Sequence, residues 1–149
     1  MANRDTHVAV GSVCGAGLAY YRSEGQSPAD QFLASIGGAL GGWLGARFPD
    51  FVDVPLSPNH RSHAHSFAGA VGISAKAKEM LLNWESDLRR RLQDVRTRKA
   101  NAATDWDRMY LGLMEILLQI GLGILSGLIA GHLSHLALDF CTPGGLPLV

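Results

Sequence analysis

The chain has 149 residues, 47% of them hydrophobic, with 13 basic side chains, 13 acidic side chains and six histidines. This length is typical of a single domain covering residues 1–149, and the apolar content excludes an intrinsically disordered chain. The formal net charge is zero and only 17% of the residues are charged, so the composition gives no reason to expect a nucleic-acid partner.

Two short apolar segments, rich in glycine and alanine, occupy the N-terminal third of the chain at residues 7–21 and 32–48. Both are shorter than the roughly 20 residues that a bilayer-crossing helix needs, so short spans, half-inserted helices and buried core helices all stay open. Gly37, Gly41 and Gly45 recur at every fourth position, which places them along one face of a helix. Small residues at this spacing allow helix backbones to approach closely.

Residues 76–108 hold most of the basic charge, with nine Lys or Arg against six acidic residues, whereas the rest of the chain has four against seven. Leucine and valine recur there with a helical period, and Trp84 is assigned to the same side. The pattern predicts a long basic amphipathic helix over residues 76–99, followed by a polar connector over 101–107. It is interpreted either as a surface helix of its own domain or as a helix lying on the cytoplasmic membrane surface.

Residues 109–130 form the strongest membrane-spanning candidate, because only Glu115 and Gln119 are strongly polar within 22 residues. Gly123, Gly127 and Gly131 follow the same four-residue spacing, which continues to His135 and Asp139. The sequence therefore predicts an all-α fold, a compact glycine-rich helical bundle that is embedded in or associated with a membrane. A soluble helical bundle stays open as the alternative.

The two cysteines, Cys14 and Cys141, stand near opposite ends of the chain in apolar surroundings. Without paired spacing they predict neither a disulfide framework nor a thiolate zinc site. We expect both to be reduced and buried.

Histidines and carboxylates gather at the ends of the glycine-rich segments, and their burial requires hydrogen bonds, ion pairs or a metal. The histidines are His7, His60, His63, His65, His132 and His135, and the nearby acids are Asp50, Asp53 and Asp139. A single histidine on an apolar face is usually a core residue, but nine such groups indicate a shared site. Mixed imidazole and carboxylate donors suit Zn, Mn or Fe. Because the candidates outnumber the four ligands of one zinc ion, two ions with a metal-activated water are predicted.

Four motifs occur in order: Thr6-His7, PDFVD at 49–53, HRSHAHS at 60–66 and GHLSHLALDFCTPGG at 131–145. Together they resemble the predicted membrane-bound metal-dependent hydrolases, the YdjM-like inner-membrane proteins. The resemblance implies an inner-membrane location. It also implies a set of metal ligands: His7, Asp50, Asp53, His60, His65, His135 and Asp139. His63 and His132 are extra to the pattern, and Ala64 stands where the family usually has threonine.

The predicted function is hydrolysis of a phosphoester or ester at the membrane, with a phospholipid as the favoured substrate. Asp53 and Arg61 are the catalytic candidates, since the Arg61 guanidinium suits a phosphate; a surface ion pair is the alternative role of Arg61. The competing hypothesis is a non-catalytic protein that disrupts or assembles in the membrane, forms homo-oligomers through its glycine faces and binds metal structurally. A nuclease is disfavoured, because the basic segment lacks the interleaved aromatic residues of single-strand binders.

Overall fold

The computed structural model describes residues 4–48 and 67–141, with side chains for 4–48 and 79–141. Within these ranges the chain forms four helices and no strand: α1 (Arg4–Arg22), α2 (Pro28–Gly45), α4 (Phe67–Ala100) and α5 (Asp105–Phe140). The predicted all-α fold class is therefore confirmed. The two N-terminal apolar segments are both helical, as α1 and α2.

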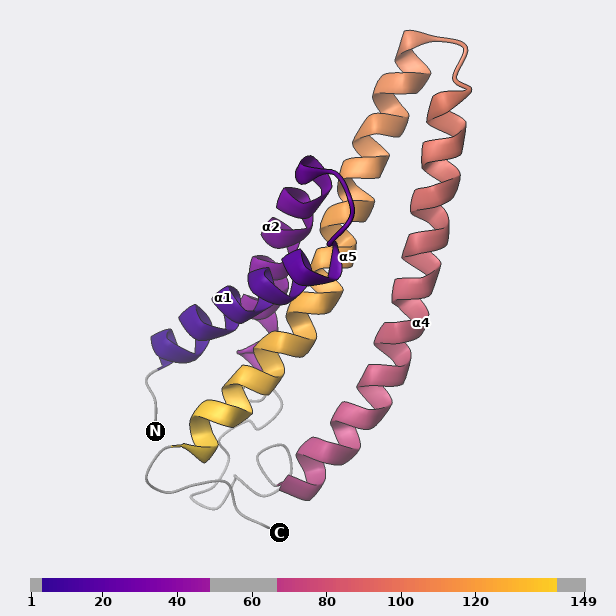
Figure 1. Cartoon of the computed structure of the whole chain (residues 1–149). Coiled ribbons are helices and arrows are strands. Elements are labelled where there is room, and N and C mark those ends of the chain that lie inside the picture. Colours follow the sequence, from indigo (N-terminus) through magenta and orange to yellow (C-terminus); the bar gives the residue numbers. More distant parts are fainter. Residues whose placement is uncertain (1–3, 49–66, 142–149) are drawn as a thin grey trace.

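The helices α4 and α5 run side by side in opposite directions, and α1 and α2 pack against the part of α5 that lies away from the α4–α5 connection (Figure 1). The connection is shorter than predicted, because Thr104 caps α5 by accepting a hydrogen bond from the Asp107 backbone N–H at 3.1 Å. Ser27 caps α2 in the same way, from the Asp30 N–H at 3.2 Å. Gly25, with φ of 84°, supplies the left-handed turn between α1 and α2.

Glycines bring α1, α2 and α5 into backbone contact. A Cβ atom built on Gly15 of α1 would overlap the Gly38 carbonyl of α2, and one on Gly41 of α2 would lie 2.8 Å from the Ile124 carbonyl carbon of α5. From the other side, a Cβ on Gly127 of α5 would lie 2.7 Å from the Gly42 nitrogen. The α2 helix therefore contacts both neighbours through glycine, and no larger residue fits at these positions without moving a helix.

The face that α4 turns toward the other helices contains Leu92 and Val95, which are 5% and 7% exposed, and Glu85, which is 8% exposed. Trp84 is 51% exposed, so its assignment to this face is wrong. Positions 84 and 85 both lie three and four residues from Leu81 and Leu88, so the helical period alone does not choose between them. The structure places Glu85 in the buried stripe and leaves Trp84 exposed. Glu85 is accommodated because Arg22 and Arg89 both pair with it.

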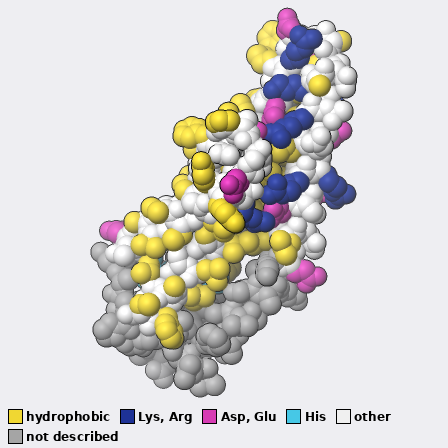
Figure 2. Space-filling model, in the orientation of Figure 1, with side chains coloured by type: hydrophobic (Ala, Val, Ile, Leu, Met, Phe, Trp, Pro, Cys, Tyr) yellow, Lys and Arg dark blue, Asp and Glu magenta, His cyan; other side chains and the backbone are white. Residues whose placement is uncertain are grey.

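Among the described residues one helix, α5, is long and apolar enough to cross a membrane, with a mean hydropathy of 2.0 in its best window. At about 1.5 Å per residue its 36 residues extend about 54 Å, more than the roughly 30 Å of a hydrocarbon core. Hydrophobic side chains gather over the α1–α2 part of the surface in Figure 2, and basic ones along the α4–α5 hairpin.

Both cysteines are exposed, which corrects the expectation of buried thiols. Val13, which directly precedes Cys14, is 72% exposed and lies on the side of α1 opposite the buried Gly11 and Gly15, and Cys14 lies at the flank of that side. Apolar neighbours along the sequence did not imply burial, because the buried side of α1 is made by its glycines and His7 rather than by its large apolar residues.

Candidate metal centre

The predicted ligands His7, His135 and Asp139 lie together where α1 crosses the C-terminal end of α5. His7 is 4% exposed, His135 is 1% exposed, and the Asp139 side chain is 12% exposed. Close packing makes this possible: a Cβ on Gly11 of α1 would lie 2.8 Å from the Gly42 carbonyl oxygen, and one on Gly131 of α5 would lie 2.8 Å from the Gly42 carbonyl carbon. Both ligand-bearing helices are thus held against the same residue of α2.

One carboxylate connects the two imidazoles. His7 Nε2 lies 3.3 Å from Asp139 Oδ1, and His135 Nε2 lies 3.3 Å from Asp139 Oδ2. The two imidazole rings stack, with centroids 4.1 Å apart and planes inclined by 23°. One nitrogen or oxygen atom from each of the three side chains lies within 4.8 Å of the others. Donor atoms from two helices therefore lie close enough together to bind one ion.

The backbone of α2 determines which nitrogen of His135 can bind a cation. His135 Nδ1 lies 2.6 Å from the Ala46 carbonyl oxygen, which can only accept a hydrogen bond. Nδ1 therefore donates its proton, and in the neutral imidazole Nε2 carries the lone pair. That lone pair faces the Asp139 carboxylate, so a proton or a cation can bind between the two groups. Metal-binding histidines commonly hold their second ring nitrogen on a backbone carbonyl in this way.

The spacing of the donors fits a transition metal. Two ligands that each lie about 2.1 Å from a tetrahedral ion are about 3.4 Å apart. The two Nε2-to-carboxylate distances, both 3.3 Å, are close to this value. Two imidazoles and one carboxylate also match the three-ligand sets that leave a coordination position open for water or substrate. By donor type and spacing, these residues fit Zn, Mn or Fe.

The other predicted site residues divide into two groups. His132 lies on α5 outside the three-residue cluster, and its ring meets Phe48 edge-on with centroids 6.2 Å apart. The remaining candidates all lie outside the described residues: Asp50, Asp53, His60, Arg61, His63 and His65. The prediction missed the Ala46 carbonyl, because every residue has a carbonyl group and only the packing of α2 on α5 selects this one.

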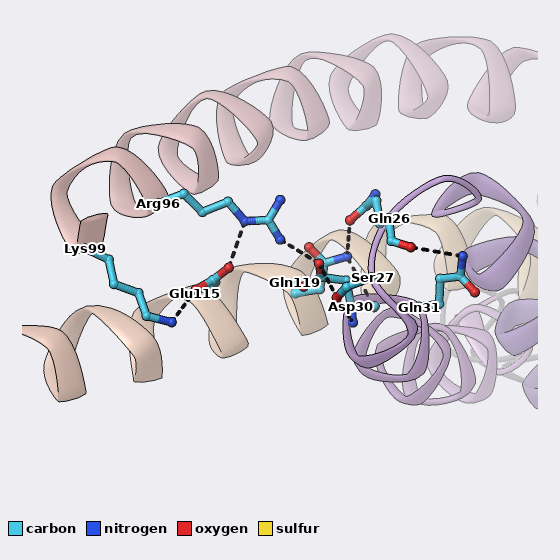
Figure 3. A network of polar contacts seen from close by, with 8 residues as sticks. All are labelled: Gln26, Ser27, Asp30, Gln31, Arg96, Lys99, Glu115 and Gln119. Atoms are coloured by element: carbon cyan, nitrogen blue, oxygen red, sulfur yellow. Dashed lines mark hydrogen bonds and ion pairs between the residues drawn. The ribbon is translucent and has the colours of Figure 1, made fainter. Parts of the chain in front are cut away.

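A separate polar network compensates the two polar residues within the apolar part of α5 (Figure 3). Glu115 accepts from Arg96 Nε at 2.8 Å and from Lys99 Nζ at 2.9 Å, and Gln119 Nε2 donates to Gln26 Oε1 at 2.8 Å. Arg96 also pairs with Asp30 of α2 at 2.9 Å.

Desolvation of the Arg96 guanidinium opposes its charge, but hydrogen bonds and charge attraction from Glu115 and Asp30 outweigh it and raise the pKa of Arg96. The Arg96 guanidinium therefore stays charged, and its pairs with Asp30 and Glu115 tie α4 to α2 and α5. It is structural and contributes no ligand to the metal centre.

Comparison with known proteins yields one family match. The family described as YdjM inner membrane protein matches residues 1–149, the full length of the chain. No curated protein matches the chain. No solved structure matches it either.

Proposed function

Because the chain belongs to the YdjM inner membrane protein family, we propose that it is a membrane-associated metal-dependent hydrolase that acts on a phosphoester or ester bond, with a phospholipid as the favoured substrate. The observation that carries the proposal is the buried cluster of His7, His135 and Asp139, with its donors 3.3 Å apart and His135 oriented by Ala46. A carboxylate held between two imidazoles is a donor set that suits a divalent cation.

In this proposal His7 and His135 hold a divalent ion, Zn before Mn or Fe, through their ring nitrogens, and Asp139 neutralises part of its charge. A bound ion of this kind activates water as a nucleophile and stabilises charge on a phosphoryl or acyl oxygen. Ala46 keeps the His135 proton on Nδ1, so that Nε2 stays available as a donor of electrons. The crossing of α1 over α5 excludes bulk water from two of the three ligands, which are at most 4% exposed.

The family resemblance supplies the remaining parts of the proposal. Asp50, Asp53, His60 and His65 would complete the ligand set and hold a second ion. Arg61 would bind a phosphate oxygen, and Asp53 would assist the reaction. We place the basic α4–α5 hairpin on the cytoplasmic side, because Lys and Arg beside apolar segments are retained there.

The competing hypothesis, a non-catalytic protein that oligomerises through its glycine faces, has less support. The glycines at 37, 41 and 45 would each place a Cβ against the backbone of α5, and those at 123, 127 and 131 against the backbone of α2. These faces are occupied within one chain. A second copy would have to bind elsewhere.

The proposal is tested by elemental analysis of the full chain, purified in detergent without chelator. We expect one to two equivalents of Zn, Mn or Fe per chain, and loss of metal in Asp139→Asn and His135→Gln. His132→Gln is the matched control, since it changes the same residue type one helical turn before His135, and it should keep its metal. A parent protein without metal contradicts the site.

Turnover of phospholipid or of a model phosphodiester separates the two functions. If Asp139→Asn folds, has lost its metal and still hydrolyses at the parental rate, the metal-dependent mechanism is wrong. If the parent binds metal but turns over none of these substrates, the structural-metal hypothesis takes its place.

A further inference from the structure

A second polar site lies at the other end of the three-helix packing, where the α1–α2 turn meets α4 and α5. A cavity of about 10 Å³ is lined there by Arg22, Arg89, Gln119 and Ser126, among others. This volume admits one group the size of a water molecule. Arg22 is fifteen residues after His7 on α1, or about 22 Å along the helix, so the cavity is separate from the metal centre.

The cavity has an excess of positive charge. Arg22 Nη2 donates to both oxygens of Glu85 at 2.8 and 2.7 Å, and Arg89 donates to Glu85 from Nε at 3.0 Å and Nη2 at 2.9 Å. Two guanidinium groups therefore share one carboxylate, which leaves one positive charge. The Arg22 and Arg89 side chains are 28% and 45% exposed, so both can still reach a ligand at the surface.

A buried acceptor in the cavity wall needs a donor. Gln119 is 1% exposed, and its Nε2 is oriented by Gln26 Oε1 at 2.8 Å and the Asp30 carbonyl oxygen at 3.3 Å. Because the Asp30 backbone carbonyl can only accept, it orients the Gln119 amide, and Gln119 Oε1 has no hydrogen-bond donor among the described residues. A ligand for this cavity therefore combines a small hydrogen-bond donor with a negative charge.

Exposed aromatic residues flank the charged residues of the cavity in the sequence. Tyr20 and Tyr21, which directly precede Arg22, are 56% and 71% exposed, and Trp84, which precedes Glu85, is 51% exposed. Tyrosine and tryptophan are enriched at the depth of lipid headgroups in membrane proteins. In a protein of an inner-membrane family, this position indicates a lipid rather than a soluble anion.

We propose that this cavity binds the headgroup of an anionic phospholipid that carries a hydroxyl group, of the phosphatidylglycerol type. The hydroxyl occupies the cavity and donates to Gln119 Oε1, while the phosphate stays at the mouth against Arg22 and Arg89. A hydroxyl fits better than an ammonium group, because it brings no second positive charge next to two guanidinium groups. This lipid is a bound ligand, not a substrate, since it lies about 22 Å from the metal ligands.

The test is native mass spectrometry of the delipidated, chelator-treated full chain titrated with three lipids: phosphatidylglycerol, phosphatidylmethanol and phosphatidylcholine. Phosphatidylmethanol has the same charge as phosphatidylglycerol but no hydroxyl. We expect phosphatidylglycerol to bind at least about threefold more tightly than phosphatidylmethanol, and both to bind more tightly than phosphatidylcholine. Because the metal has been removed, the result is independent of the proposed hydrolase activity.

Two variants assign the binding to the cavity. Arg89→Gln should weaken phosphatidylglycerol binding about tenfold, whereas Arg90→Gln removes the same charge from the next residue, an exposed one, and should change it less than about twofold. Gln119→Leu should remove the preference for phosphatidylglycerol over phosphatidylmethanol. It should keep the preference of the protein for both anionic lipids over phosphatidylcholine.

Three outcomes overturn the proposal. Equal binding of phosphatidylglycerol and phosphatidylmethanol by the parent would mean that the cavity does not recognise a hydroxyl group. Equal effects of Arg89→Gln and Arg90→Gln would mean that only bulk charge matters. Soluble glycerol phosphate binding as tightly as phosphatidylglycerol would identify a soluble ligand instead of a lipid.

Discussion

The contact between Gly15 of α1 and Gly38 of α2 allows a sharp test of the glycine packing. In Gly15→Ala the new Cβ would overlap the Gly38 carbonyl oxygen and lie 2.9 Å from Gly42 Cα, about 0.5 Å or more inside ordinary contact. The new Cβ is fixed to the backbone of α1, and the atoms that it meets are backbone atoms of α2. No side-chain rotation relieves the overlap, so α1 must move away from α2. Overpacking of this kind lowers the free energy of unfolding by about 1–3 kcal/mol. The higher helix propensity of alanine offsets roughly 1 kcal/mol of this loss.

Gly17→Ala is the matched control, because it lies half a turn further along α1 and its Cβ meets nothing within 4 Å. It should be neutral or stabilising by up to about 1 kcal/mol. Thermal unfolding of both variants in the same detergent measures the difference, which we expect to be about 1–3 kcal/mol, or roughly 2–12 °C in Tm. Equal melting temperatures for the two variants would refute the close contact between α1 and α2.

Two further predictions concern α4 and the metal centre. Glu85→Ala should lower the free energy of unfolding by about 2 kcal/mol, since it leaves two partly buried guanidinium groups without their carboxylate. Asp87 has an exposed side chain, so Asp87→Ala should change the free energy of unfolding by less than about 0.5 kcal/mol. Denaturant titrations measure both. Gly131→Ala and Gly123→Ala should destabilise to similar extents, because each Cβ would lie 2.9 Å from a backbone nitrogen, that of Ala46 directly after α2 and that of Gly38 within α2. Only Gly131→Ala should also lower the metal content, because its contact is with Ala46, which orients His135. If Gly131→Ala keeps its metal, the packing at this glycine does not control the metal centre.

The fold class and the meeting of three candidate ligands were predictable from the sequence for a physical reason. Helical periodicity is local, and the i, i+4 spacing of His135 and Asp139 places both on one face of any helix that forms. His7 follows from the same logic only with the assumption that α1 packs against α5. The contact between α1 and α5 depends on glycines, which allow a close approach because they have no Cβ atom. The sequence alone does not identify the helix that each glycine contacts.

What escaped prediction depends on partners distant in sequence. The helical period places Trp84 on the side of the leucines, yet Glu85 is the buried residue, with Arg22 from α1 and Arg89 compensating its charge. Exposure of Cys14 follows from the same cause, since an apolar neighbourhood in sequence says nothing about which side of a helix is covered. In both cases the buried side is the one with glycine or ion-pair partners.

The glycine spacing connects the packing to the chemistry of the site. Residues 131 and 135 are one turn apart on α5, so the contact that Gly131 makes near Ala46 also determines how far the Ala46 carbonyl lies from His135 Nδ1, which is 2.6 Å. Any larger residue at 131 would push α2 outward and lengthen this hydrogen bond. The Ala46 carbonyl holds the proton on His135 Nδ1 and so leaves Nε2 available. This hydrogen bond depends on the absence of a methyl group at position 131, one turn earlier, and Gly131 therefore contributes to the site although it has no side chain.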